Sequence, residues 1–433
     1  MTQPRLRPPP AIQGICRTLE AAGFEAWCVG GAVRDAFLGI ATLDWDIATA
    51  ARPEDVQRLF RRTVPVGVRF GTVGVLDRDG VLHEVTTFRH DVETDGRHAV
   101  VRFGASLEED LARRDFTINA IAVHAERLEV RDPFGGRADL AARLVRCVGD
   151  PRERMREDRL RALRAIRFAG RFGFAIDPAT WEAIRESAPH LGRLSMERVK
   201  QELEKVMEQV ASPSGTLERY REGGIFATLV PALATAPATR FRAIDHLARP
   251  GLTGRPHRRA LRLAALFVEP GQVPPRDLER TLKALKYSNV EARAAVALAG
   301  AAGALSWPLD PALGEGMLRR VVARVGRLDL PSLARILWAH VAAATDGPVP
   351  DSARRAGRAL YRRALRIAWR DPLTIGDLAV DGDDLRRVGV PAGRAVGETL
   401  ARLLEAVLDD PARNTREALL ALASVEPGSL GPR

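Results

Sequence analysis

The sequence has little cysteine and no long apolar stretch. Its three cysteines, Cys16, Cys28 and Cys147, are far apart and odd in number, so they indicate neither a disulfide framework nor the paired spacing of a zinc site. No segment is long and apolar enough for a membrane span, and residues 1–10 lack the apolar core of a signal peptide. We therefore expect a soluble, cytoplasmic protein that has no membrane partner.

Lysine is also scarce, yet the chain is strongly basic. Lysine occurs only at Lys200, Lys205, Lys283 and Lys286, so nearly all of the positive charge is arginine. Lysine and arginine together number 66 against 55 acidic residues, which gives a net charge of +11. A general preference for arginine would explain the choice between the two bases, but not the surplus over acids. Such a surplus favours a polyanionic partner, because each neutralised phosphate releases counterions.

The hydrophobic pattern divides the chain into a mixed α/β first third and a helical remainder. A chain of 433 residues is too long for one ordinary core, so several domains are expected. Strand signals almost vanish after about residue 150, where amphipathic helical segments follow one another. We predict an α+β head followed by an all-α neck, body and tail. Their expected limits are 11–150 for the head, 151–215 for the neck, 216–306 for the body and 307–433 for the tail.

Four local predictions matter for the candidate site. Residues 71–76 and 82–88 are expected to form a hairpin joined at Asp79-Gly80. The other three are a strand over residues 43–48, a polar loop over 89–104 and one continuous helix over 153–172.

Two aspartates in the expected strand 43–48 are candidate metal ligands. Residues i and i+2 of a strand project from the same face, so Asp44 and Asp46 can face one site while Trp45 and Ile47 enter the core. Carboxylate oxygens suit Mg²⁺. A pair of such ions can activate a 3′ hydroxyl and stabilise a leaving pyrophosphate. Taken alone, an Asp-x-Asp pattern more often marks surface acids, so its meaning depends on its setting.

That setting is a glycine turn just before the aspartates. An expected strand ends in Gly30-Gly31, and a helix begins at once. Glycines let the backbone approach a ligand closely, and a new helix offers free N–H groups to phosphate. Arg34, one turn into the helix, can add charge-assisted bonds to a triphosphate. An ordinary strand-to-helix turn would explain the glycines alone, but not their combination with two aspartates.

The segment Gly30-Gly-Ala-Val-Arg-Asp35 followed by Asp44-Trp-Asp46 resembles motif A of the class II tRNA nucleotidyltransferases. These enzymes belong to the polymerase beta-like superfamily, which also holds bacterial poly(A) polymerases. The likeness continues through residues 84–89, 106–120, 131–136 and 156–161. It implies that Asp44 and Asp46 bind Mg²⁺, and that Gly31 and Arg34 meet the nucleotide. Glu84 is either a third carboxylate of the metal site or a solvated or salt-bridged strand residue.

A second candidate site lies on the expected helix 153–172. Asp158, Arg161, Arg164 and Arg167 recur every three residues and form one stripe, while apolar residues face elsewhere. The plain interpretation is a solvated helix with acid–base pairs. A sharper interpretation follows from chemistry, because aspartate only accepts hydrogen bonds and arginine only donates them.

An Asp–Arg pair matches the Watson–Crick edges of cytosine and adenine, each of which has a donating amine beside an accepting ring nitrogen. Uracil and guanine present the reverse order. Each unmet bond would cost roughly 1–3 kcal/mol, so one protein template would select CTP and ATP. The resemblance agrees, because the Glu-Asp-x-x-Arg motif of this family selects the incoming base. By that match Asp158 and Arg161 read the base, while Arg164 and Arg167 support the nucleotide.

The resemblance has two further implications. In Arg113-Arg114-Asp115, Arg114 would contact ribose or phosphate, and Asp115 would orient Arg114 or neighbouring arginines. The body and tail would hold the elbow of a tRNA, so that its acceptor end meets the head.

The leading hypothesis is therefore template-independent addition of C, C and A to the 3′ end of tRNA. Three alternatives stay open. The segment 89–104, which helps the family switch from C to A, is slightly short here, so the enzyme could add only CC or only A. A bacterial poly(A) polymerase is the second alternative, although residues 65–74 and the tail read like the tRNA branch. A non-catalytic RNA-binding protein is the most remote, because the carboxylate pair is intact.

Overall fold

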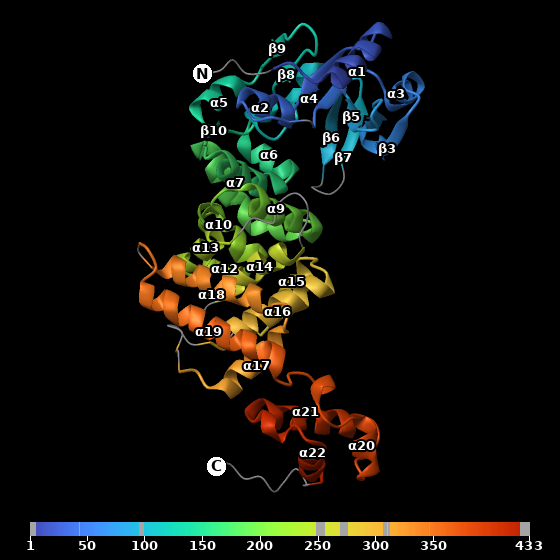
Figure 1. Cartoon of the computed structure of the whole chain (residues 1–433). Coiled ribbons are helices and arrows are strands. Elements are labelled where there is room, and N and C mark those ends of the chain that lie inside the picture. Colours follow the sequence, from blue (N-terminus) through green and yellow to red (C-terminus); the bar gives the residue numbers. More distant parts are fainter. Residues whose placement is uncertain are drawn as a thin grey trace. The chain divides into compact units, whose positions relative to one another are not determined.

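The computed structural model describes residues 6–42, 44–94, 99–247, 256–268, 276–305, 310, 312–345 and 347–424. The chain folds into two compact units, Met1–Thr235 and Ala236–Arg433 (Figure 1). The first unit carries the mixed α/β head and the helices that follow it, and the second is helical throughout its described part. The predicted class, an α+β head followed by helical segments, is confirmed.

A seven-stranded mixed sheet forms the framework of the head. Its strand order is β3-β4-β5-β2-β1-β8-β9, and β2 lies between an antiparallel neighbour, β1, and a parallel one, β5. The central strands are buried, as their apolar sequences require. The bounds are β1 Ala26–Val29, β2 Asp46–Thr49, β3 Thr63–Gly67, β4 Thr72–Leu76, β5 Leu82–Thr87, β8 Ala122–Val123 and β9 Val130–Arg131.

The hairpin expected at Asp79-Gly80 is confirmed. Strands β4 and β5 pair antiparallel, and Gly80 adopts a left-handed φ of +82° in the turn between them. Three helices accompany these strands: α1 Pro10–Ala21, α2 Gly31–Phe37 and α3 Pro53–Leu59. Helix α1 buries Ile12, Ile15 and Leu19 on one face.

The polar loop predicted over residues 89–104 is wrong. Strands β6 Arg89–Thr94 and β7 Ala99–Phe103 pair antiparallel there, with Arg89 opposite Phe103, and residues 95–98 between them lie outside the described part. The second strand contains Val100 and Val101, whose branched side chains favour extended backbone. The polar composition of β6 conceals its extended conformation, because polarity alone does not distinguish a loop from a strand.

The helices after the sheet position the second candidate site. The continuous helix predicted over 153–172 is wrong, because it is divided at Asp158, whose backbone is extended (φ −144°, ψ 101°). Helix α6 ends before Asp158 and α7 begins after Arg159; α7 then packs against α9 and α10. The bounds are α4 Leu107–Ala112, α5 Gly136–Ala142, α6 Pro151–Glu157, α7 Leu160–Phe172, α8 Pro178–Ser187, α9 Met196–Gln209 and α10 Pro213–Glu222. Short strands β10 Leu144–Val145 and β11 Ala175–Ile176 pair beside α7.

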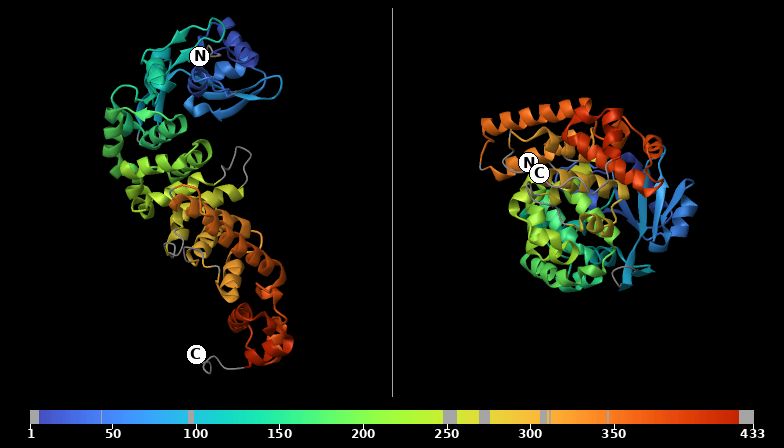
Figure 2. Two further views of the ribbon diagram at one scale, coloured as in Figure 1. Left: turned by 60° about the vertical axis from the view of Figure 1, so that its left-hand side comes forward. Right: turned by 90° about the horizontal axis from the view of Figure 1, so that it is seen from below.

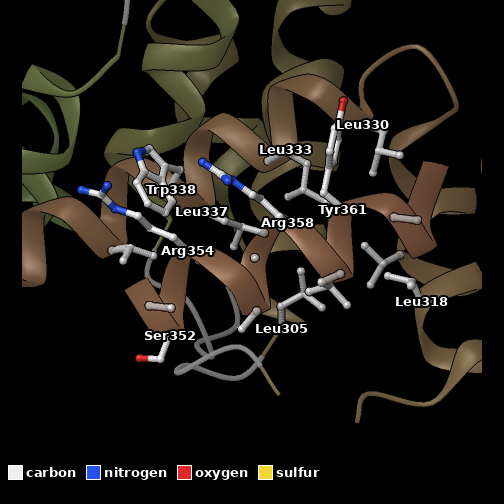
Figure 3. A pocket seen from close by; sticks show the side chains of 18 residues that line it. Leu305, Leu318, Leu330, Leu333, Leu337, Trp338, Ser352, Arg354, Arg358 and Tyr361 are labelled. Carbon is white, nitrogen blue, oxygen red and sulfur yellow. The ribbon is translucent and has the colours of Figure 1, made fainter. Parts of the chain in front are cut away.

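The second unit is a set of packed helices (Figure 2). Its described helices are α13 Ala238–Asp245, α14 Pro256–Phe267, α15 Leu278–Ala284, α16 Asn289–Gly303, α17 Glu315–Val325, α18 Leu330–Ala344, α19 Asp351–Arg370, α20 Gly382–Arg387, α21 Arg394–Asp409 and α22 Arg416–Ala423. The last three enclose a small core built on Leu385, Leu403 and Leu419. An apolar cavity of about 680 Å³ lies among α17, α18 and α19, with Trp338, Arg354 and Arg358 gathered at one end (Figure 3). No helix in the described ranges combines the length and apolar character needed to cross a bilayer.

The unit boundary at Thr235 falls inside the segment expected to be the body. The joint expected between body and tail, at residues 306–307, lies outside the described residues.

Candidate active site

The two candidate metal ligands lie at the beginning of β2. Asp46 is the first residue of that strand, and Asp44 precedes it by two residues. The expectation that both belong to the strand is therefore wrong for Asp44, which is exposed in the preceding connection. The prediction that Trp45 and Ile47 enter the core is confirmed, because Trp45 is 3% exposed and Ile47 is fully buried.

Strand pairing brings a third carboxylate next to Asp46. Ile47 of β2 pairs with Val85 of β5 in a parallel ladder, so Glu84 is the neighbour of Asp46 across that ladder. Burial raises the pKa of Asp46 to about 6, Arg114 opposes the rise, and the charges of Asp44 and Glu84 add to it. Crowded carboxylate oxygens of this kind fit a hard divalent cation, which would offset their mutual repulsion.

The structure limits how many of these acids belong to one ion site. Across the described residues, no group of three histidine, cysteine or acidic side chains is close enough to hold a metal ion. The fit to Mg²⁺ therefore rests on the pair Asp44 and Asp46, and Glu84 acts on Asp46 through its charge.

The glycine turn lies directly against Asp46. Gly30 has a φ of +73°, which strongly favours glycine, and it precedes the first residue of α2. A Cβ atom at Gly30 would meet Arg114 Nη1 at 2.9 Å and Asp46 Oδ2 at 3.4 Å. The glycine backbone, Asp46 and Arg114 therefore converge at one point, as the sequence predicted for Gly30-Gly31 and Asp46.

Arg114 comes to this point from the end of α4. Its Nη2 donates to Asp110 Oδ2 at 3.2 Å, and Arg113 donates to the other oxygen of the same carboxylate. Burial would raise the pKa of Asp110, but these two guanidiniums outweigh it and lower the pKa. Arg114 Nε is buried without a hydrogen bond to any described atom, so Arg114 retains capacity for a further acceptor.

Arg34 is held by hydrogen bonds to other side chains of the head. It is 3% exposed, and its nitrogens donate to Asp35 Oδ1 at 2.6 and 2.8 Å and to Asn119 Oδ1 at 2.6 Å. Its guanidinium also lies over the rings of Phe168 and Phe172. Arg34 thus packs beneath the glycine turn, 3.5 Å from a Cβ placed on Gly31. Direct contact between Arg34 and a triphosphate stays a prediction, and it would require these bonds to open.

Asp115 orients Arg164. Two nitrogens of Arg164 donate to Asp115 Oδ2 at 2.7 and 2.8 Å, and Asn119 donates to Oδ1 at 2.8 Å. Burial would raise the pKa of Asp115, but Arg164 and Asn119 lower it to about 2. Of the two roles that the sequence left open for Asp115, the structure shows the orientation of a neighbouring arginine.

These contacts join into a continuous series that we call the head–neck ion chain. It begins on α7, crosses to α2 beneath the glycine turn, and returns to α7 through the segment after α4. Its members in order are Arg171, Asp35, Arg34, Asn119, Asp115 and Arg164. The two candidate sites are therefore linked by side-chain hydrogen bonds within the first unit.

The predicted base-reading residues are held by partners that sequence reasoning missed. Asp158 Oδ2 accepts from Arg198 at 2.6 Å. Arg161 is 8% exposed and donates to Glu157 at 2.7 Å and to the Arg113 carbonyl at 3.0 Å. Arg113 directly precedes Arg114, so this bond connects α7 to the segment that places Arg114 beside Gly30 and Asp46.

Arg167 is buried in an ion pair with Glu202. Its Nε donates to Glu202 Oε2 at 2.6 Å, and both side chains are almost fully buried. Arg167 therefore supports the packing of α7 on α9 and does not lie on an open stripe beside Arg164. Glu202 and Arg198 are separated from their partners by 35 and 40 residues, so no local sequence pattern pairs them.

Two protein-family models match two successive parts of the chain. Residues 26–146 match the family described as "Poly A polymerase head domain", and residues 173–236 match "Probable RNA and SrmB- binding site of polymerase A". The chain is 38% identical over 417 residues to the CCA-adding enzyme of Geobacillus kaustophilus, which spans 94% of this chain and 95% of that one. It is 35% identical over 413 residues to the CCA-adding enzyme of Latilactobacillus sakei, with 94% and 96% covered.

A solved structure is similar to this chain over almost its whole length. The crystal structure of the Bacillus stearothermophilus CCA-adding enzyme in complex with CTP has a TM-score of 0.67 and 36% identity, covering 95% of this chain and 96% of that one. Whole-length similarity of this degree, together with the carboxylate pair and the glycine turn, shows that this chain belongs to the family of CCA-adding enzymes.

Proposed function

We propose that this chain adds C, C and A to the 3′ end of tRNA from CTP and ATP, with Asp44 and Asp46 holding two Mg²⁺ ions. The observation that carries the proposal is the convergence of Asp46, Arg114 and the Gly30 backbone at one point. When bound, the ions would activate the terminal 3′ hydroxyl and stabilise the departing pyrophosphate.

The residues around this point have distinct proposed roles. Gly31 is the first residue of α2 and lets a triphosphate approach the backbone. Arg34 supports the turn from below and would contact a phosphate only if its present bonds open. Arg114 offers its unpaired Nε to a ribose or phosphate oxygen.

Base choice is proposed to belong to Asp158 and Arg161. Asp158 accepts the exocyclic amine of cytosine or adenine, and Arg161 donates to the neighbouring ring nitrogen. Arg198 orients Asp158 through its 2.6 Å bond. Arg164 and Arg167 support this arrangement from the next turns of α7, one through Asp115 and the other through Glu202.

The tRNA is proposed to extend along the helical remainder of the chain, with its elbow held by the body and tail. The composition supports this because the chain carries a net charge of +11. A relative that is 36% identical over 95% of this chain was solved with CTP, which supports the choice of nucleotide.

One assay tests the function and separates its alternatives. Purified protein is given tRNAs that end before the CCA, after the first C and after CC, each with labelled CTP or ATP. Addition of the correct letter to all three supports a full CCA-adding enzyme. Addition of A to the last alone would identify an A-adding enzyme, arrest after the second C would identify a CC-adding one, and long A tracts would identify a poly(A) polymerase.

The metal assignment is tested with Asp44→Asn and Asp46→Asn, which keep the size of each side chain. Both variants should lose incorporation while tRNA binding stays nearly intact. Glu108→Gln, which removes one exposed charge from α4, is the matched control and should keep full incorporation. Persistent incorporation by both aspartate variants would refute the assignment.

A further inference from the structure

A small basic pocket lies on the neck, between α6, α8 and the 3₁₀ turn Ala188–Arg193. Its volume is about 300 Å³. The polar side chains that line it are Arg152, Arg156, Arg159, Glu186, Ser187 and His190. None of these residues has a role in the nucleotide site proposed above.

The charges around this pocket do not balance. Arg152 makes two bonds of 2.7 Å to Glu186, so that pair neutralises itself. Arg156 donates to the main-chain carbonyl of Arg152, and Arg159 donates to Ser187 Oγ at 3.2 Å. In the described part of the chain neither Arg156 nor Arg159 forms an ion pair, although Asp150 interacts with Arg156 through its charge from a longer distance.

The groups around Arg159 add to this surplus of positive charge. Burial lowers the pKa of Arg159, and the nearby charge of Arg193 lowers it further, with no acidic group acting in the opposite direction. Ser187, which accepts a hydrogen bond from Arg159, is the last residue of α8 and is 4% exposed. Arg159 is therefore held in place by a buried hydroxyl and lacks an anion.

We propose that this pocket binds a phosphate group through Arg156 and Arg159, and that the phosphate belongs to the backbone of the bound tRNA. Guanidinium groups present paired donors that match phosphate oxygens, and one phosphate can satisfy two arginines at once. The backbone assignment rests on the proposed function, whereas the affinity for phosphate does not. The pocket adds an anchor for RNA at Arg156 of α6 and at Arg159, which directly precedes α7, separate from the residues proposed to read the base.

The test measures tRNA affinity at several salt concentrations, without nucleotide, for the full-length protein and three variants. Arg159→Gln and Arg156→Gln each remove one charge from the pocket. Arg78→Gln removes one charge from the exposed turn between β4 and β5 and serves as the matched control. Loss of a phosphate contact reduces the slope of log K against log salt by about 0.7 to 0.9 and weakens binding on the order of tenfold at moderate salt.

A second arm tests free phosphate. The melting temperature of each protein is measured in sodium phosphate and in sodium chloride of equal ionic strength. If phosphate stabilises the unaltered chain but not Arg159→Gln, while the tRNA slope is unchanged, the pocket takes a free phosphate and the backbone assignment fails. A reduced slope in both pocket variants, but not in Arg78→Gln, supports the backbone assignment.

Two outcomes overturn the proposal. The first is an unchanged slope together with no difference between phosphate and chloride. The second is an equal change in Arg78→Gln, which would mean that bulk charge alone matters. Failure of the proposed function is a separate result, because the unaltered chain would then not extend any tRNA even if the pocket binds phosphate.

Discussion

Replacing Asp115 with asparagine should destabilise the first unit by about 2 to 2.5 kcal/mol at pH 7. The pKa of Asp115 falls from an ordinary 3.8 to about 2, because Arg164 and Asn119 outweigh the effect of burial. Linkage converts a shift of that size into roughly 2.5 kcal/mol of stability. Little discount for solvent is needed, since the Asp115 side chain is only 11% exposed.

The sign of the pH dependence follows from the lowered pKa. The stabilisation is fully present above the unfolded pKa of 3.8 and is lost as the pH falls through the folded value of about 2. The difference between the unaltered chain and Asp115→Asn should therefore stay constant from pH 7 to about pH 5 and shrink below pH 4.

Hydrogen exchange of the β1 and β2 amides at pH 7 reports the opening of the unit that contains Asp115. Glu108→Gln is the control, because it neutralises an exposed carboxylate on nearby α4 and should change the opening free energy by less than about 0.5 kcal/mol. Equal effects of the two substitutions would refute the view that Arg164 and Asn119 hold Asp115 ionised.

Three further predictions concern other contacts of the first unit. Gly30→Ala should reduce incorporation at least tenfold while the protein stays folded, because the new Cβ would displace Arg114; wild-type rates would contradict the convergence at Gly30. Glu202→Gln leaves the charge of Arg167 buried and should lower the free energy of unfolding by about 3 kcal/mol in urea titrations, and an unchanged midpoint would refute the pair. Burial raises the pKa of Cys147 to about 12, so iodoacetamide at pH 8 should label it only after unfolding, as mass spectrometry can show.

The parts of the fold that depend on neighbouring residues could be predicted from the sequence. The Asp79-Gly80 turn fixes the register of β4 and β5 locally, and the apolar spacing of α1 marks its buried face. The strand β2 was placed too early by a few residues, because an alternating pattern does not show where the ladder with β1 and β5 begins. The glycine turn and Asp46 were correctly expected to meet, since both lie at ends of adjacent strands.

The parts that depend on distant residues could not be predicted in this way. A regular spacing of three suggested one stripe for Asp158, Arg164 and Arg167, but Asp158 lies outside α7 and Arg167 faces Glu202. Arg34, whose contact with a phosphate stays a prediction, is enclosed by Asp35, Asn119 and two phenylalanines that its local sequence pattern does not indicate. Each of these side chains has at least one partner from another element: Arg198 for Asp158, Glu202 for Arg167 and Asn119 for Arg34.

The head–neck ion chain has a consequence for how such an enzyme can change over generations. If α7 helps to choose the base, as proposed, a substitution that shifts α7 would also displace Asp115 and, through Asn119, Arg34 beneath the glycine turn. Base choice and reaction rate would then be coupled, because one series of hydrogen bonds connects the residues proposed for each. We would then expect related chains with another base choice to differ at several of these six residues together.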